Sequence, residues 1–353
     1  MVYPKYTLTQ SIVQNLARIE LVKQSFEKTP ISPVLLASLR DTAKTSSIHY
    51  STQIEGNRLT KEEVANVLKG KSLSAKQRDE KEVKAYYDAL VYVESALAKN
   101  ASFSEELISK IHNLVEGKKR SIPYRDGQNA IYDSATRAKI YLPPEAKDVP
   151  SLMKKLVEWT NENQKLTVPL LAGIVHYQFV TIHPYYDGNG RTARLLTTFI
   201  MRKFGCDLKG IYSLEEYYAK NLMAYYEALQ THPHHNYYYG RNKADITNWL
   251  EYFIAGVKDA FENVLKHAEE IPHMTQDKTT LMRELNIKQR RVLELFINFK
   301  EITSTQVAET LSISVGAARA LMREFMENDF LVPANESKKA RTYRLAEKYQ
   351  ELV

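Results

Sequence analysis

At 353 residues the chain is too long for one ordinary domain and long enough for two or three, which excludes a disulfide mini-protein. Its composition, 44% hydrophobic and 26% charged with only 12 glycines and 12 prolines, excludes a disordered tail and favours a globular, helix-rich protein. The formal net charge of +7 permits a polyanionic partner, such as a nucleotide or a nucleic acid, without requiring one.

The cysteine content and the absence of long apolar runs bear on the compartment. Cys206 is the single cysteine, so the chain has no disulfide framework and no thiolate zinc site. The N-terminus lacks the apolar core of a signal peptide, and no run of eighteen apolar residues occurs in the sequence. We therefore expect a cytoplasmic protein with no membrane span.

Helical periodicity dominates the first hundred residues. Apolar residues within 12–22 recur at the spacing of one helix face, and a short connection with two prolines follows. A second helix is predicted over 35–50, with a C-terminal signal where glycine and asparagine follow Glu55. Further amphipathic helices are predicted at 61–68, 76–97 and 104–114.

One short stretch breaks this pattern and predicts a β-hairpin. Residues 129–142 are rich in β-branched and aromatic residues, and the turn formers Asp133 and Ser134 lie between two candidate strands. Pro143 and Pro144 end the second strand. Helices are predicted to resume after the hairpin, at 149–161, 168–182, 191–204, 214–229 and 245–266.

The character of the chain changes after the polar stretch 267–280. Three short helical patterns follow, at 287–299, 304–311 and 314–327, and the last two begin with capping residues. Two strands then flank a basic loop, and three helices with a two-stranded wing are the plan of a winged helix-turn-helix. We therefore expect a mostly helical fold in three regions: an N-terminal helical region at 1–100, a core at 101–266 and a winged helix domain at 281–353.

One segment between two predicted helices has the residues of a phosphate-binding site. It starts at His183 and reads HPYYDGNGRTAR. Gly188, Asn189 and Gly190 supply a backbone that adopts positive φ and turns its N–H groups inward. The next helix offers its N-terminus to an anion. This segment therefore predicts an anion hole.

Two arginines, a carboxylate and an imidazole complete this candidate site. Arg191 and Arg194 share a helix face, and each can grip phosphate oxygens with two N–H groups. Asp187, a hard carboxylate beside bound phosphates, suits Mg²⁺. His183 is placed to remove a proton from an incoming hydroxyl. Each residue alone is a common structural feature, but together within one short segment they indicate phosphoryl or nucleotidyl transfer.

This segment resembles the signature of the Fic family, HPFxxGNGR, with Tyr185 in place of the common Phe. We expect that change to be benign because either ring packs under the loop, although Tyr adds a hydroxyl that needs a partner. The resemblance covers residues 5–260, including the end of the hairpin and the helical stretches 219–229 and 245–257. It implies a Fic-type helical bundle with a β-hairpin flap, in which residues 101–266 are the catalytic core.

The resemblance implies a protein adenylyltransferase that moves AMP from ATP to a Tyr, Thr or Ser hydroxyl of a target protein or of itself. His183 would be the general base, Asp187 the magnesium ligand, and residues 188–190 the nest for the α- and β-phosphates. Arg191 and Arg194 would clamp the β- and γ-phosphates. The nucleotide-binding set would also include Thr192, Ala193 and Asn221, with Tyr225 and Tyr226 near the adenosine.

Two further features follow from the resemblance. Gly190 favours transfer of AMP over transfer of phosphate, because family members that act as kinases have lysine there. The end of the hairpin, Ile140, Tyr141 and Leu142, would be a flap that holds the target segment by strand addition through main-chain hydrogen bonds.

The segment STQIEG, from Ser51 to Gly56, resembles the family's inhibitory motif, [ST]xxxE[GN]. A Glu55 carboxylate that reaches Arg194 would pair with the guanidinium that the γ-phosphate needs, so ATP would bind in a non-productive pose. The resting enzyme is therefore expected to be self-inhibited by Glu55 within the nucleotide-binding site. The same carboxylate could instead orient water for removal of AMP from a modified target, and the sequence does not separate these two uses.

The C-terminal region supports a hypothesis of a different class, a DNA-binding regulator. Between residues 281 and 353, twelve Lys and Arg oppose ten Asp and Glu, a net excess of two that is thin for an electrostatic footprint. Winged helices also mediate protein contacts, so DNA and a second copy of the chain are both left open as partners. The basic residues that would meet DNA are Arg319 and Arg323 of the reading helix and Lys338, Lys339, Arg341 and Arg344 of the wing.

Overall fold

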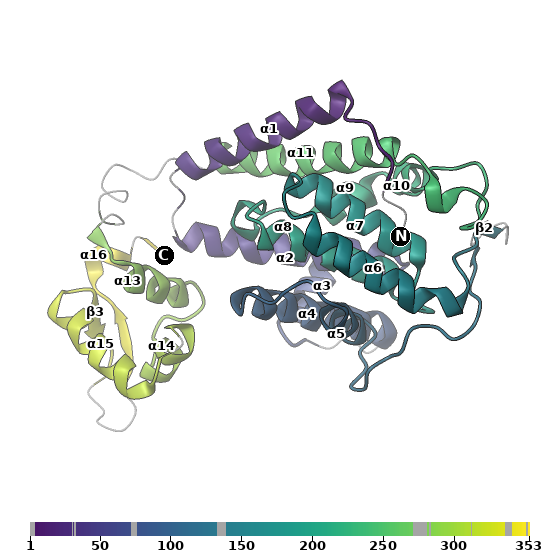
Figure 1. The fold of residues 1–353 in the computed structure, drawn as a ribbon. Coiled ribbons are helices and arrows are strands. Elements are labelled where there is room, and N and C mark those ends of the chain that lie inside the picture. Colours follow the sequence, from purple (N-terminus) through teal and green to yellow (C-terminus); the bar gives the residue numbers. More distant parts are fainter. Residues whose placement is uncertain are drawn as a thin grey trace. The chain divides into compact units, whose positions relative to one another are not determined.

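The computed structural model describes residues 4–29, 31, 33–71, 76–132, 139–270, 281, 284–311, 313–335, 341–350 and 352–353. The chain divides into two compact units (Figure 1). The first comprises Met1–Glu27 and Thr42–Lys266, and the second comprises Lys28–Asp41 and His267–Val353. The N-terminal helical region and the core expected from the sequence thus both contribute to the first unit.

In the described residues up to 270, the regular structure is helical apart from one small hairpin. The predicted helices are confirmed there, with bounds that differ by a few residues, except that the helix predicted over 214–229 is two helices. The elements are α1 (Gln10–Lys28), α2 (Pro33–Ile54), α3 (Lys61–Leu68), α4 (Gln77–Ala98), α5 (Glu105–Val115), β1 (Ile131–Tyr132), β2 (Lys139–Tyr141), α6 (Val149–Glu162), α7 (Val168–Ile182), α8 (Asn189–Lys203), α9 (Leu214–Lys220), α10 (Leu222–Leu229) and α11 (Thr247–Glu270), with 3₁₀ turns at Ala146–Asp148, Leu208–Gly210 and Arg241–Lys243.

Helix α7 is central to the first unit because almost its whole surface is apolar. Its sequence, VPLLAGIVHYQFVTI, buries residues on every side, as expected of a helix that is packed all round. It packs against α6 and α8, and α4 packs against α5 and α8. Trp249 of α11 donates a hydrogen bond to the Gly173 carbonyl of α7 (2.8 Å). This packing fixes the end of α7 and the start of α8, where the segment that starts at His183 lies.

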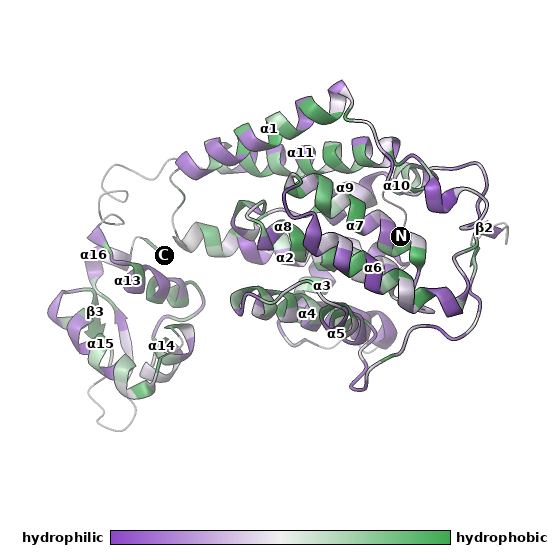
Figure 2. Cartoon of the chain, in the orientation of Figure 1, coloured by the Kyte–Doolittle hydropathy of each residue, from purple (hydrophilic) through white to green (hydrophobic). Residues whose placement is uncertain are grey.

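Helices at the surface of the first unit are amphipathic. Figure 2 shows hydrophilic and hydrophobic residues mixed along α1, as expected of a helix with one buried face, which includes Ile12, Ile19, Val22 and Phe26. None of the helices in the described part of the chain combines the length and the apolar composition that a membrane crossing requires.

The helix predicted over 214–229 is divided in the structure. Asn221 interrupts it with φ −140° and ψ 72°. The Asn221 side chain accepts a hydrogen bond from the Ala224 N–H (3.2 Å) and so caps α10. Local capping by asparagine therefore overrides the helical periodicity of the aromatic residues on both sides.

The second unit contains helices α13 (Ile287–Leu293), α14 (Ser304–Leu311), α15 (Val315–Glu327) and α16 (Glu347–Gln350), a 3₁₀ turn at Glu294–Ile297, and strands β3 (Leu331–Pro333) and β4 (Tyr343–Leu345). The two strands pair antiparallel, with Leu331 opposite Leu345. A hydrophobic core that includes Ile302, Phe325 and Phe330 joins the helices to the strands.

The order of elements in the second unit follows the expectation for a winged helix, and that assignment stays a prediction. The predicted helix 287–299 is shorter, because it passes into the 3₁₀ turn at Glu294. Arg319 and Arg323 of α15 are exposed, as a reading helix requires. Lys338 and Lys339 of the predicted wing lie outside the described residues.

Candidate active site

The segment that starts at His183 joins α7 to α8 through a sharp turn. His183 ends α7 in the left-handed region (φ 51°), and Gly188 precedes α8 in the same region (φ 71°, ψ 2°). The first helical hydrogen bond of α8 runs from the Thr192 N–H to the Gly188 carbonyl (2.9 Å). The amides of residues 189–191 precede that bond and, as at every helix start, have no acceptor within the helix. They form the place where an anion would bind.

The side chain of Asn189 locks this turn. It donates to the Tyr185 carbonyl (2.8 Å) and accepts from the Tyr185 N–H (3.1 Å). The Tyr185 ring is stacked on His112 of α5, with 3.5 Å between ring centroids. Burial lowers the pKa of His112 to about 4, and the nearby positive charge of Arg191 lowers it in the same direction, so the stacked imidazole is neutral at pH 7. Asn189 thus offers a ligand only its main-chain amide.

The imidazole of His183 is a neutral base. Its Nδ1 lies 3.3 Å from the Val180 carbonyl oxygen, and a carbonyl can only accept, so Nδ1 carries the proton and Nε2 keeps its lone pair. Burial lowers the pKa of His183 to about 4, opposed by the Val180 hydrogen bond and assisted by the charge of Arg125. The residue as a whole nevertheless remains partly exposed. It can therefore accept a proton from a group that approaches from solvent.

Arg125, in the loop after α5, holds the backbone of this turn. Its Nε donates to the His183 carbonyl (2.9 Å), and its main-chain N–H donates to the Pro184 carbonyl (2.9 Å). Its Nη1 donates to the Gly127 carbonyl (3.1 Å). The residue is only 2% exposed. Nothing in the sequence singles out Arg125, because an isolated arginine in a loop has no recognisable pattern.

Arg194 is buried and is held by the last turns of α2. Its Nε donates to Ser51 Oγ (2.7 Å), and its Nη2 donates to the Ser51 carbonyl (2.8 Å) and to Glu55 Oε1 (2.8 Å). Burial alone would lower the pKa of Arg194, but the Glu55 carboxylate outweighs that effect and raises the pKa. Glu55 also lies over Gly190, where an added Cβ would be 2.5 Å from Glu55 Oε1. The carboxylate thus fills the space next to the amides at the start of α8.

Arg191 is held by carboxylates from three parts of the chain. Its Nη1 lies 2.9 Å from Glu82 Oε1 of α4, and its Nη2 lies 3.1 Å from Glu116 Oε1 and 3.6 Å from Asp187 Oδ1. Burial raises the pKa of Glu116, and the charge of Arg191 opposes that shift. Glu82 and Glu116 are candidates that the sequence does not reveal, since they lie far from Arg191 along the chain and in no motif.

Asp187 has the exposure that a metal ligand at this site needs. Its side chain is 79% exposed, and its Oδ1 accepts a hydrogen bond from the Gly188 N–H (2.7 Å). Within the described residues, no group of three His, Cys, Asp or Glu side chains is arranged to hold a metal ion. A lone carboxylate beside phosphate-binding amides fits Mg²⁺, which combines one or two carboxylates with phosphate oxygens and water. A cation at Asp187 would therefore be completed by the nucleotide.

Comparison with known proteins identifies a family that part of this chain matches. Residues 102–201 match the model of the Fic/DOC family. This chain contains a Fic domain. It is 29% identical over 210 residues to the protein adenylyltransferase Fic of Drosophila grimshawi and 28% identical over 209 residues to that of Drosophila erecta. Each match covers 56% of this chain but only 42% and 41% of the relatives, so the chain spans about two fifths of the length of the curated relatives it matches.

Solved structures share the fold. A Fic family protein from Desulfovibrio desulfuricans G20 is 24% identical, with a TM-score of 0.63 over 98% of both chains. A Fic domain containing signaling protein from Bacteroides thetaiotaomicron is 22% identical, with a TM-score of 0.61 over 72% of this chain and 98% of that chain. These matches confirm the mostly helical, Fic-type fold.

The other residues expected at the nucleotide lie in different surroundings. Thr192 and Ala193 are fully buried in α8, and Thr192 Oγ1 lies 3.3 Å from His112 Nδ1. Tyr225 is buried, and its hydroxyl lies 2.9 Å from His176 Nε2. Asn221 uses its side chain to cap α10. Their roles in binding nucleotide stay predictions. The role of Tyr226 also stays a prediction; burial and the nearby charge of Glu55 raise the pKa of its hydroxyl.

The hairpin expected to act as a flap is present, and its second strand is anchored to the Fic domain. Asp133 and Ser134 of the predicted turn lie outside the described residues. The Tyr141 hydroxyl donates to the Thr181 carbonyl of α7 (2.8 Å), while Ile140 is half-buried. Leu142 is already paired, because its N–H donates to the His235 carbonyl (2.9 Å) and its carbonyl accepts from the Tyr237 N–H (3.0 Å). A target strand therefore could not pair with Leu142 while that bridge persists.

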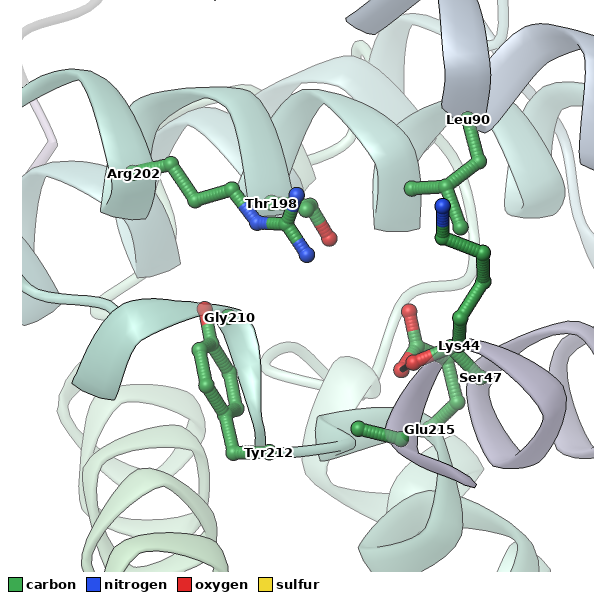
Figure 3. A pocket seen from close by; sticks show the side chains of 9 residues that line it. Lys44, Ser47, Leu90, Thr198, Arg202, Gly210, Tyr212 and Glu215 are labelled. Atoms are coloured by element: carbon green, nitrogen blue, oxygen red, sulfur yellow. Dashed lines mark hydrogen bonds between the residues drawn. The ribbon is translucent and has the colours of Figure 1, made fainter. Parts of the chain in front are cut away.

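A small cavity between α2, α8 and the start of α9 lies apart from this site (Figure 3). Side chains of Arg202, Tyr212 and Glu215 surround its hollow in Figure 3. Its volume of about 10 Å³ suits a group the size of one water molecule, so it cannot hold a nucleotide.

Tyr185→Phe should raise the free energy of unfolding by about 1 kcal/mol. Among the described residues, the buried Tyr185 hydroxyl makes no hydrogen bond of good geometry and only a weak interaction with Ser109, so its removal relieves a desolvation cost while the ring stays stacked on His112. Urea unfolding followed by tryptophan fluorescence measures the change. The matched control is Tyr141→Phe, which removes a buried hydroxyl that is hydrogen-bonded and should lower stability by about 1 kcal/mol. A loss of stability in Tyr185→Phe would contradict this account.

Proposed function

We propose that this chain is a protein adenylyltransferase, which transfers AMP from ATP to a Tyr, Thr or Ser hydroxyl of a target protein or of itself. One observation carries the proposal. His183, a partly exposed residue with a neutral imidazole, lies in the turn before α8, close to the glycine-rich main-chain amides at the start of that helix. The name of the Drosophila relatives, protein adenylyltransferase Fic, supports the same reaction. ATP is the substrate that this reaction requires.

The reaction needs a base on one side of the α-phosphorus and anion binding around the phosphates. His183 Nε2 takes the proton of the target hydroxyl as its oxygen bonds to the α-phosphorus. The bond from the α-phosphorus to the bridging oxygen breaks, and pyrophosphate leaves with the electron pair. The amides of Asn189 and Gly190 stabilise the charge on the phosphate oxygens, and Arg191 and Arg194 hold the leaving pyrophosphate.

Asp187 would hold Mg²⁺ together with phosphate oxygens. When bound, the cation offsets the charge of the phosphates and of the leaving pyrophosphate. The exposure of Asp187 and its position before the first amide of α8 fit that role.

Glu55 would inhibit the resting enzyme. Its carboxylate pairs with Arg194 and lies over Gly190, so it competes with the γ-phosphate for the same guanidinium. Removal of AMP with Glu55 as the group that orients water is the alternative use of this residue. DNA binding by the second unit, a homodimer and a cytoplasmic location stay predictions.

Glu55→Gly should raise the transfer of label from α-labelled ATP to protein by about tenfold or more, since it frees Arg194 for the γ-phosphate. Adding His183→Ala to that variant should abolish the labelling, because no base remains. Incubation of purified protein with α-labelled ATP and a cell lysate, followed by a gel, measures both. Gln53→Gly is the matched control, because it places a glycine at an exposed residue two positions before Glu55, in the last turn of α2, and it should leave labelling unchanged. Flat labelling in Glu55→Gly would exclude the inhibitory role, and label only from γ-labelled ATP would indicate a kinase.

The transfer rate of Glu55→Gly should be independent of pH from about pH 6 to pH 8 and should fall only below about pH 5. The pKa of His183 is lowered to about 4, so the imidazole loses its basic lone pair only when the pH approaches that value. The charge of Glu55 raises the pKa of His183, so the loss of Glu55 keeps low the pH at which the rate begins to fall. Initial rates at saturating ATP, with thermal unfolding at each pH as the control, give the profile. An acid limb near pH 6.5 would show an ordinary, solvated imidazole instead.

A further inference from the structure

Asn57 lies directly after the inhibitory segment and is almost completely buried. Its Oδ1 accepts from the Leu59 N–H (3.1 Å), which fixes the orientation of the side-chain amide. The Nδ2 group therefore faces α4, where it donates to Glu82 Oε2 (2.8 Å) and to the Asp79 carbonyl (3.0 Å). The turn that ends α2 is thus tied to α4 by a side chain whose groups all have partners.

Glu82 uses its two oxygens for two different elements. Oε2 accepts from Asn57, and Oε1 pairs with Arg191 Nη1 of α8 (2.9 Å). The Arg191 and Glu82 side chains are 9% and 18% exposed, so water cannot fully replace a lost partner. One carboxylate therefore joins the turn after α2 to the first arginine of α8.

Both arginines of the Fic segment are consequently held from one stretch of chain. Arg194 is bound directly by Ser51 and Glu55, and Arg191 is bound through Glu82 by Asn57. Only one residue, Gly56, separates Glu55 from Asn57, so a movement of this turn that withdraws Glu55 also changes what holds Glu82.

Building on the proposed function, we propose that Glu82 is a positioning residue that couples the turn at Asn57 to Arg191. With Asn57 in place, Glu82 is oriented and keeps Arg191 paired away from the nucleotide. When the turn moves, Glu82 loses one of its two anchors and holds Arg191 less firmly. Arg191, which Glu116 and Asp187 also contact, can then turn toward the phosphates more readily. The inhibitory segment would then control two arginines, one directly and one through Glu82.

Asn57→Asp tests the coupling because it keeps the shape of the side chain but replaces the donor that faces Glu82 with a second carboxylate. In the presence of Glu55, this variant should raise labelling from α-labelled ATP about fivefold or more. In the Glu55→Gly background it should change labelling by less than about twofold, because the turn is already released. An equal rise in both backgrounds, or none in the first, would overturn the coupling.

Arg58→Ala is the matched control for a general loosening of the turn. Arg58 also ties this turn to α4, through Asp79 (3.3 Å), but its side chain is 80% exposed and it does not contact Glu82. Its loss should leave labelling unchanged. A rise in labelling as large as that of Asn57→Asp would show that any loosening of the turn raises transfer. It would contradict a specific role of Glu82.

Glu82→Gln in the Glu55→Gly background reports on positioning itself. It should lower the KM for ATP by up to about fivefold with kcat changed less than about twofold, because Arg191 loses the carboxylate that holds it away from the phosphates while His183 is untouched. A fall in kcat alone would contradict the proposal, and thermal unfolding shows whether each variant folds. If Glu55→Gly gives no transfer at all, the proposed function fails. The coupling is then measured by calorimetry with ATP, which Asn57→Asp must bind more tightly than the unchanged chain.

Discussion

A buried guanidinium dictates the resting state of this site. Arg194 is 2% exposed, and an ion removed from water to that degree requires a countercharge, since an unpaired buried charge costs several kcal/mol. Glu55 supplies the charge, and Ser51 supplies two further acceptors. Any nucleotide that uses Arg194 must replace these contacts with phosphate oxygens. On the proposed function, the γ-phosphate and the Glu55 carboxylate would therefore compete for the same guanidinium.

The end of a helix makes this competition possible. The last carbonyls of α2 have no helical donor, and the C-terminal end of a helix attracts positive charge. The Thr52 carbonyl accepts from the amides of Glu55 and Asn57, while the Ser51 carbonyl accepts from Arg194. The guanidinium thus completes the cap of α2. The helix end and the arginine stabilise each other, so release of Glu55 alone leaves part of the contact intact.

Local patterns in the sequence predict the fold well where the determining contacts are local. The helix over 168–182 ends as expected because an apolar run meets His183-Pro184, and the turn before α8 follows from its glycines. The pairing of Glu55 with Arg194 is predicted only through the resemblance, since the two residues are far apart along the chain. Glu82, Glu116 and Arg125 escape prediction for the same reason. Each acts on the segment from a different element, and only packing brings them together.

The acidic residues around the two arginines would add electrostatic repulsion of phosphates to the proposed inhibition. Glu55, Glu82, Glu116 and Asp187 lie within 4 Å of Arg191 or Arg194, so four carboxylates surround two guanidinium groups. Burial already raises the pKa of Glu116, and Asp187 nearby acts in the same direction, as expected where negative charge is crowded. A triphosphate adds further negative charge to this place. On the proposed function, its productive binding would be favoured by withdrawal of Glu55 and by a cation at Asp187, so nucleotide, metal and the turn at Glu55 would be parts of one charge balance.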